Sequence, residues 1–183
     1  MKLNISNLLT LARILVIPII VVCIYLKSPF YGWIAFVLFC LASITDYFDG
    51  YIARKLNQIT DFGTFLDPIS DKIFVASVLI LLVAFERITG VWIILVIIIF
   101  AREFLISGLR EFLGPKNIKM PVSLLAKWKT TAQILAIGFL LVGDASPEFI
   151  PSILIGDILL WIAGIVTVQT GYIYLRTGLK HLD

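Results

Sequence analysis

Four aspartates in the first half of the chain stand in two closely spaced pairs, Asp46 with Asp49 and Asp67 with Asp71. Residues three or four positions apart share one face of a helix, so each pair predicts two carboxylates that point the same way. Four converging carboxylates repel one another unless positive charge lies between them. Carboxylate oxygens select Mg²⁺, Mn²⁺ or Ca²⁺ rather than zinc, and the single histidine, His181, is remote in sequence. The spacing predicts a divalent-cation site, and two ions about 3.5–4 Å apart would also bind a diphosphate.

Small residues and one arginine accompany the aspartates. Gly50 and Ala53 lie on or beside the helix face of the first pair, Arg54 follows directly, and Gly63 precedes the second pair. Such small residues let a bulky ligand approach the backbone, although they also permit tight helix packing. Arg54 is long enough to pair with an aspartate or a phosphate. The structural alternative is a solvated helix end in which Asp67 caps the next helix, but ionisable residues near a membrane core favour a functional role.

Together these residues form the pattern D-x2-D-G-x2-A-R-x8-G-x3-D-x3-D, which resembles the signature of the CDP-alcohol phosphotransferase family at every position. The resemblance covers essentially the whole chain and implies a six-helix membrane fold. It implies that Asp46, Asp49 and Asp67 bind two divalent cations, Mg²⁺ or Mn²⁺, and that Asp71 is both a ligand and the general base. The last role agrees with the composition, because a hydroxyl nucleophile must lose a proton and no histidine is suitably placed to take it.

The resemblance also assigns residues to the CDP-lipid substrate. It implies that the small residues of the pattern, Gly50, Ala53 and Gly63, line the cytidine pocket. It also implies that the arginine of the pattern, Arg54, contacts the phosphates. The N-terminal NLLTLAR places Asn7, Thr10 and Arg13 at helical spacings and resembles the opening of members of this family. Asn7 and Thr10 therefore join the predicted CDP-lipid site. In the alternative, both are interfacial polar residues and Arg13 extends its charged end to water.

Two basic stretches further along the chain bear on the acceptor alcohol. AREFLISGLREF carries Arg102 and Arg110, AKWKTTAQ carries Lys127, and such a cluster of cations can seat a second phosphate. Both stretches resemble family members whose acceptor is sn-glycerol 3-phosphate, which predicts transfer of the phosphatidyl group of CDP-diacylglycerol to that alcohol with release of CMP. Inositol phosphate, serine and phosphatidylglycerol stay open as acceptors. Arg102 and Glu103 could also be a structural ion pair with a neighbouring helix.

Composition indicates the elements that must position these residues. The chain has 183 residues, of which 60% are hydrophobic and 15% charged, and it is too apolar for a soluble domain. We expect one all-α membrane domain, residues 1–183, with six transmembrane helices. The apolar stretches are Leu8–Leu26, Trp33–Thr45, Ile69–Phe85, Val91–Phe112, Trp128–Val142 and Ile153–Leu175. The second is too short to cross alone, so its helix should continue into the segment with Asp46 and Asp49.

Basic residues set the expected orientation. With six spans, all but two of the 15 Lys and Arg residues fall on the side that holds both termini, and the two exceptions are Lys27 and Arg87. By the positive-inside rule, both termini and the aspartates face the cytoplasm. We expect a multi-pass protein of the bacterial cytoplasmic membrane, with its active site on the cytoplasmic side, in contact with membrane lipids and without a nucleic-acid partner. The resemblance further implies a homodimer.

Two other classes of protein stay open at this point. A divalent-cation transporter would use the aspartates as a permeation site, and it predicts carboxylates along several spans. A non-catalytic scaffold explains neither the spacing of the aspartates nor the glycines. Gly164, Gly171 and Gly178 are seven residues apart around the last span, and they predict a close-packing seam between two subunits or within one chain.

Overall fold

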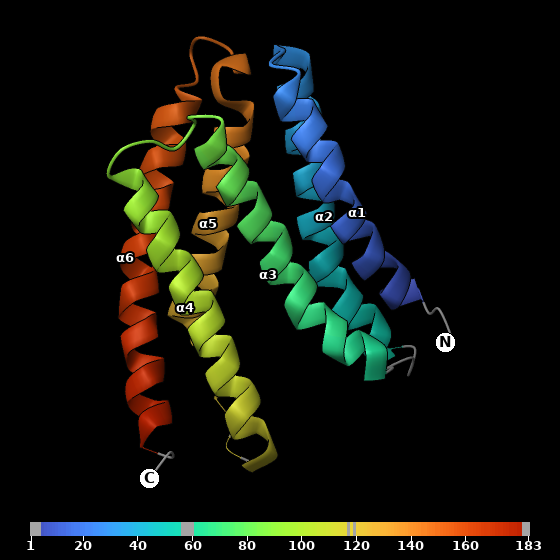
Figure 1. Cartoon of the computed structure of the whole chain (residues 1–183), viewed down its shortest axis with the longest axis vertical. Coiled ribbons are helices and arrows are strands. Elements are labelled where there is room, and N and C mark those ends of the chain that lie inside the picture. The colour runs from blue at the N-terminus through green and yellow to red at the C-terminus, as the bar shows by residue number, and fades with distance from the viewer. Residues whose placement is uncertain (1–4, 56–60, 117, 119, 181–183) are drawn as a thin grey trace. The chain divides into compact units, whose positions relative to one another are not determined.

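The computed structural model (Figure 1) describes the backbone of residues 5–55, 61–116, 118 and 120–180, and their side chains except at residues 5, 6, 46–55, 61, 62 and 64. This described part is all-helical and contains no strand, as the sequence predicted. Its α-helices are α1 (Ile5–Tyr25), α2 (Pro29–Lys55), α3 (Asp61–Ala84), α4 (Trp92–Leu113), α5 (Leu124–Val142) and α6 (Ser152–Leu179). The short 3₁₀ turns η1 (Gly114–Lys116) and η2 (Gly143–Ala145) follow α4 and α5.

Four helices of the described part are long and apolar enough to cross a membrane, namely α1, α4, α5 and α6. The apolar part of α2, Pro29–Thr45, is shorter. As predicted, α2 continues beyond this part to Lys55, so Asp46 and Asp49 lie on helical backbone. The fold is that of a protein with several apolar helices, and the full set of six spans stays a prediction.

The start of α3 differs from its predicted position. The apolar stretch predicted a helix from Ile69, whereas α3 begins at Asp61. Asp67 therefore lies inside the helix and does not cap it, and Pro68 is an interior residue rather than part of the first turn. A proline in this position removes one helical hydrogen bond, which the remaining turns of α3 tolerate. The prediction was wrong because it followed the apolar residues, whereas the helix also includes the polar turns before them.

The bounds of α5 and α6 differ for the same reason. Helix α5 begins four residues before Trp128, because the hydroxyl of Ser123 accepts the backbone N–H of Ala126 at 3.2 Å and caps the helix. Helix α6 continues four residues past Leu175, to the end of the polar turn that contains Arg176. Hydropathy alone marks the part of a helix that is apolar and leaves out its polar ends.

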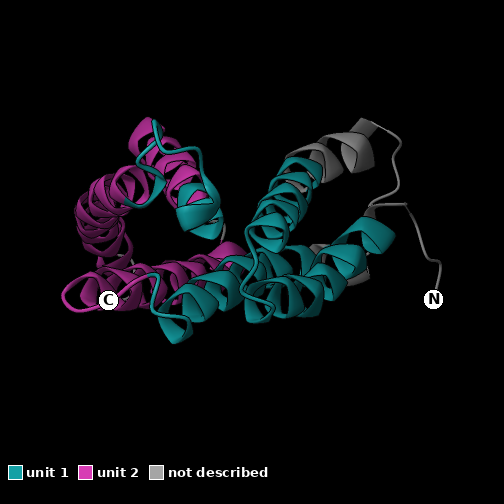
Figure 2. Ribbon diagram, turned by 90° about the horizontal axis from the view of Figure 1, so that it is seen from above, with its two compact units in different colours: residues 1–87, 138–153 teal, residues 88–137, 154–183 magenta. Residues whose placement is uncertain are grey.

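The chain forms two compact units, coloured in Figure 2. Unit 1 comprises residues 1–87 and 138–153, and unit 2 comprises residues 88–137 and 154–183. Helices α1, α2 and α3 belong to unit 1, and α4 belongs to unit 2. Helix α5 contributes its first part to unit 2 and its end to unit 1, and nearly all of α6 belongs to unit 2.

In unit 1, α1 packs against both α2 and α3. Phe39 of α2 and Phe74 of α3 are buried and stack, with ring centroids 5.4 Å apart and planes 13° apart. The end of α5 joins this core, because Gly138 lies directly against the ring of Phe36. In Figure 1 the start of α1, the end of α2 and the start of α3 lie at the same end of the unit. The elements that carry the aspartate pattern and NLLTLAR thus meet there.

In unit 2, the glycines of α6 pack against side chains of α4. Gly164, Gly171 and Gly178 lie against Leu95, Arg102 and Leu109, respectively. The three glycines and the three α4 residues each repeat every seven positions, and residue numbers increase in the same direction along both helices, so α4 and α6 run parallel. The α4 side chains occupy the space left by the missing side chains of the α6 glycines. The seam that the sequence predicted is therefore within the chain.

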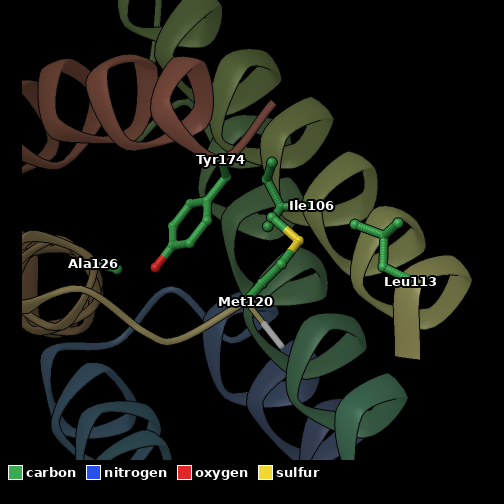
Figure 3. Close-up of a cluster of buried hydrophobic side chains, with 5 residues drawn as sticks. All are labelled: Ile106, Leu113, Met120, Ala126 and Tyr174. Atoms are coloured by element: carbon green, nitrogen blue, oxygen red, sulfur yellow. The ribbon is translucent and has the colours of Figure 1, made fainter. Parts of the chain in front are cut away.

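A cluster of buried side chains joins α4, α5, α6 and the segment before α5 in unit 2. Figure 3 shows its members, Ile106, Leu113, Met120, Ala126 and Tyr174. The hydroxyl of Tyr174 accepts the backbone N–H of Ser123 at 2.8 Å and donates to the carbonyl of Pro121 at 3.0 Å. These bonds fix the start of α5, which carries Lys127 and Lys129, against α6.

Candidate active site

Asp67 and Asp71 of α3 are held by two residues of α1. The hydroxyl of Thr10 donates to Oδ1 of Asp67 at 2.7 Å. The guanidinium of Arg13 donates to Oδ1 of Asp71 and forms an ion pair with it. Thr10 and Arg13 are one turn apart on α1, as are Asp67 and Asp71 on α3, so two parallel helices meet in register. The two carboxylates therefore have fixed orientations.

Burial separates the roles of the two helices in this contact. Thr10 is 1% exposed and Arg13 is 3% exposed, whereas the side chain of Asp71 is 40% exposed. The alternative for NLLTLAR, in which Arg13 extends its charged end to water, is wrong. The α1 residues lie behind the carboxylates, and the carboxylates reach an accessible surface where a ligand can bind.

Ser70 is a member of this contact that the sequence did not predict. It is fully buried between the two aspartates. Its hydroxyl donates to the backbone carbonyl of Asp67 at 3.0 Å and accepts from Arg13 at 3.4 Å. The bond to the carbonyl is one that a serine commonly makes within a helix, so its contacts with Arg13 and, at 3.5 Å, with Oδ1 of Asp71 distinguish it. A polar residue next to Asp71 in an apolar helix was the available signal.

The structure describes only some of the other residues of the predicted site. Gly63 is buried in the first turn of α3, and Asn7 is 2% exposed on α1. The rest lie on the last turns of α2 and their side chains are outside the described ones, namely Asp46, Asp49, Gly50, Ala53 and Arg54. The described residues contain no cluster of three or more metal-ligating side chains, and the four-aspartate metal site stays a prediction because two of its members lie outside them.

The described half of the aspartate pattern fits a site for a hard divalent cation. Asp67 and Asp71 offer carboxylate oxygens, the ligands that Mg²⁺ and Mn²⁺ prefer. Each carboxylate has one oxygen oriented by a donor from α1, as donors behind a metal site orient its ligands. Among the described side chains of this contact, Arg13 brings one positive charge to the two negative charges of Asp67 and Asp71. Additional positive charge would therefore stabilise the arrangement.

Unit 2 contains a second cluster of charged side chains, between α4 and α5. Oε1 of Glu103 accepts from Nη1 of Arg102 at 2.9 Å and also from the ammonium of Lys129. The Arg102 guanidinium contacts α6 as well, because it donates to the hydroxyl of Thr170 at 3.4 Å and lies 5.5 Å from the centroid of the Tyr174 ring. The side chain of Lys129 is 3% exposed. Arg102 and Glu103 do form an ion pair, and the third member is a lysine that the sequence did not predict.

The residues predicted to bind the acceptor phosphate all lie in unit 2. Arg110 and Lys127 are exposed, whereas Arg102 is held by Glu103 and α6. Nε of Arg102 is buried and finds no hydrogen-bond partner among the described residues. Lys129 stands two residues after Lys127 in AKWKTTAQ, and the signal for its burial was its helical spacing from the buried Ala126 and Gln133.

The apolar helices and the oriented aspartates define an all-helical membrane protein with a carboxylate site. The chain belongs to the CDP-alcohol phosphatidyltransferase family, whose family model matches residues 3–169. It is 47% identical to a protein of Rickettsia bellii over 97% of both chains. It is 41% identical to a protein of Haemophilus influenzae, over 97% of this chain and 95% of the relative, and 40% identical to one of Bacillus subtilis, over 98% and 97%. All three relatives are named CDP-diacylglycerol–glycerol-3-phosphate 3-phosphatidyltransferase.

Proposed function

We propose that this protein transfers the phosphatidyl group of CDP-diacylglycerol to sn-glycerol 3-phosphate, giving phosphatidylglycerophosphate and CMP. The proposal rests on one observation. The aspartate pattern is complete in a chain that matches relatives of this name along nearly their whole length, and α1 holds two of its aspartates in fixed orientations. The CDP-alcohol phosphatidyltransferase family generally uses divalent cations, which agrees with the carboxylate oxygens of the pattern.

In the proposed reaction, the acceptor hydroxyl oxygen forms a bond to the lipid-proximal phosphorus. The bond from that phosphorus to the oxygen shared with CMP breaks, and CMP leaves with the bonding electrons. Asp71 takes the hydroxyl proton, and Arg13 keeps its carboxylate oriented for this transfer. Two Mg²⁺ or Mn²⁺ ions, held by Asp46, Asp49, Asp67 and Asp71, would neutralise the charge of the diphosphate when bound.

The CDP-lipid contacts follow from the family pattern. Cytidine and the diphosphate would contact Asn7 on α1, the small residues and arginine of α2, and one glycine of α3, namely Gly50, Ala53, Arg54 and Gly63. The hydroxyl of Thr10 donates to Asp67, so Thr10 contributes by positioning that carboxylate. The buried position of Gly63 supports a close approach of another group to the α3 backbone.

The acceptor phosphate would be bound by cations of unit 2. Arg110 and Lys127 are exposed and available, and Arg102 offers its buried Nε–H. A phosphate needs several donors, and arginine supplies them in a planar arrangement. Serine, which lacks a phosphate, would not use this cluster. An inositol phosphate would use it, so the choice between the two phosphorylated acceptors depends on the names of the relatives.

We further propose six spans with both termini in the cytoplasm of a bacterial cell, with the protein in the cytoplasmic membrane and its active site on the cytoplasmic side. The uneven distribution of Lys and Arg supports this orientation. A homodimer is proposed by family analogy, and its interface would use another surface than the glycines of α6, since these contact α4.

The deciding experiment measures CMP release by the purified protein with CDP-diacylglycerol, Mg²⁺ and one candidate alcohol at a time. We expect sn-glycerol 3-phosphate to be the preferred acceptor and chelation of Mg²⁺ to abolish release. Asp71→Asn should lower kcat by about 10²–10⁴-fold, the usual contribution of a general base. Asp157→Asn, which changes an aspartate outside the pattern, serves as the matched control.

Three outcomes distinguish the alternatives. Preference for serine or inositol phosphate would overturn the proposed acceptor but keep the enzyme. Unchanged release by Asp71→Asn would overturn the proposed base. No release with any alcohol would overturn the enzyme, and Mg²⁺ flux into proteoliposomes would then test the transporter.

A further inference from the structure

Unit 1 contains a cavity at its other end, remote from the aspartates. Its volume is ≈ 140 Å³, where about 10–15 Å³ suffices for one water molecule. The cavity lies at the C-terminal end of α1, and the helix rises roughly 22 Å from Thr10 to its last residue, Tyr25. The first turn of α2, the ends of α3 and α5, and η2 complete its walls. We call it the Lys27–Arg87 cavity after the two cations that line it.

The walls of this cavity combine an apolar floor with two positive charges. Cys23, Leu82 and Leu140 are part of the floor, and Lys27 and Arg87 provide the charges. These two residues are also the two that the six-span arrangement places opposite the other basic residues. Basic residues are disfavoured on that side of a membrane, so two of them in one cavity call for a reason.

Neither cation is needed to cap the helices that end at the cavity. The backbone N–H groups of Leu26 and Lys27 bond the last carbonyls of α1, at 3.1 Å each. At the end of α3, Glu86 and Arg87 do the same through their backbone N–H groups, at 3.1 and 2.8 Å. Backbone donors thus bond four terminal carbonyls that a basic side chain could otherwise satisfy, those of Val22, Ile24, Leu82 and Val83. Of the two side-chain charges, that of Arg87 pairs with the exposed carboxylate of Asp144, which also lines the cavity.

Arg87 pairs with Asp144, but one of its donors makes no hydrogen bond to a described residue. Its Nη1 is buried, lies 3.8 Å from Oδ2 of Asp144, and forms no hydrogen bond with any residue that the structure describes. The guanidinium is fixed in place by Gly143, since a Cβ on that glycine would collide with it. Asp144 is 80% exposed, so its side chain can turn away at little cost. The Arg87 side chain is 30% exposed and lines the cavity, so its accessible part can receive an anionic oxygen.

The backbone of Lys27 provides a way to test its side chain. Its φ of 48° lies in the left-handed region, where glycine is favoured and another residue costs about 1 kcal/mol or more. Glu86 has a φ of 58° in the equivalent position after α3, but it is not one of the described residues that line the cavity. Lys27→Gly and Glu86→Gly therefore form a matched comparison. Both substitutions should relieve the same backbone strain, but only Lys27→Gly removes a cation from the cavity.

We propose that the Lys27–Arg87 cavity binds a phosphate group, supplied by the headgroup of an anionic phospholipid or by free phosphate. The two cations receive the phosphate oxygens, and the apolar floor receives the carbon atoms next to the phosphate when the source is a lipid. The site is separate from the proposed active site and does not depend on the proposed reaction.

Cys23 provides a local probe of occupancy, because it lines the cavity and the only other cysteine is Cys40. In a Cys40→Ala background in dodecyl maltoside, the rate of Cys23 modification by a small methanethiosulfonate is measured by mass spectrometry. The probes are dihexanoyl phosphatidic acid, inorganic phosphate and, as the phosphate-free control, dihexanoylglycerol. We expect a phosphate-bearing probe to slow modification about tenfold, as expected for charge-assisted hydrogen bonds. Slowing by phosphatidic acid alone indicates a lipid source, and slowing by both indicates that free phosphate suffices.

The variants test which residues are responsible. Lys27→Gly and Arg87→Gln should remove the protection, whereas Glu86→Gly should keep it. Asp144→Asn should strengthen it, because the competing carboxylate is gone. Melting temperature gives a second measurement, and phosphatidic acid should raise it more for the wild type than for Lys27→Gly. Equal protection by dihexanoylglycerol, equal loss in Glu86→Gly, or no difference between wild type and Lys27→Gly in both measurements would overturn the proposal.

Discussion

The aspartate cluster of unit 1 and the Glu103 cluster of unit 2 combine charges in opposite proportions among the side chains that the structure describes. In unit 1, the described residues place one guanidinium, that of Arg13, beside the carboxylates of Asp67 and Asp71. In unit 2, one carboxylate, that of Glu103, accepts hydrogen bonds from both Arg102 and Lys129. Among these described side chains, carboxylates outnumber cations in the first cluster and cations outnumber carboxylates in the second.

The two clusters also differ in how they are held. Hydrogen bonds from α1 orient the aspartates of unit 1, and the side chain of Asp71 remains 40% exposed. Packing holds the cluster of unit 2, where Arg102 lies against Gly171 and the Tyr174 ring, and the side chain of Lys129 is 3% exposed. Changes in the first cluster should therefore affect activity, and changes in the second should affect folding.

The largest effect is expected for Glu103→Gln. This change removes the negative charge from a cluster in which Lys129 is almost fully buried. Leaving a buried charge unpaired lowers the free energy of unfolding by about 3–5 kcal/mol. A large fall of the melting temperature in detergent would confirm it, with the exposed Glu148→Gln as control. A melting temperature equal to that of the control would show that the cluster is not held as described.

Arg13→Gln should have the next largest effect, and on activity rather than stability. Removing a residue that orients a metal ligand typically lowers activity about 10–100-fold. Stability should fall less than in Glu103→Gln, since Asp71 is partly exposed and water can solvate it. Arg13→Lys keeps the charge and should recover part of the activity. CMP release and melting temperature are measured on the same variants, and together they distinguish a loss of activity, expected for unit 1, from a loss of stability, expected for unit 2. Equal loss of stability in Arg13→Gln and Glu103→Gln would contradict the comparison.

The seam between α4 and α6 is tested by a pair of glycines. A Cβ on Gly178 would lie 2.9 Å from Cγ of Leu109, whereas a Cβ on Gly108 would have nothing within 4 Å. Gly178→Ala should lower the free energy of unfolding by about 1–3 kcal/mol. Gly108→Ala should raise it by about 0.5–1 kcal/mol, because alanine favours the helix. Thermal unfolding measures both, and the same sign for both would show that α6 does not pack on α4 in this way.

The smallest effect is expected for Thr10→Val, which keeps the shape of the side chain and removes its hydroxyl. Loss of the hydrogen bond to Asp67 should lower kcat by about tenfold or less, as one bond to a charged group contributes little more than that. Thr10→Ser restores the hydroxyl and should restore the rate. If valine leaves CMP release unchanged, the orientation of Asp67 does not depend on α1.

Much of the fold could be predicted from the apolar stretches of the sequence, because a helix that crosses a membrane must be apolar over most of its length. The helical class and the continuation of α2 into the aspartate segment were confirmed, since exposed backbone in a bilayer must be helical. The starts of α3 and α5 could not be located in this way. They depend on polar turns and, at Ser123, on a capping hydrogen bond that hydropathy does not register.

The sequence by itself determined the family and the aspartate pattern, because the gaps of three and four residues within the pairs Asp46–Asp49 and Asp67–Asp71 follow from the helical repeat. The tertiary structure decided which groups contact these carboxylates and which cations are already engaged. Arg13 bonds an aspartate 58 residues away, and Lys129 bonds a glutamate 26 residues away. Such contacts depend on which helix faces meet, and the spacing of residues within a single helix does not specify its neighbours.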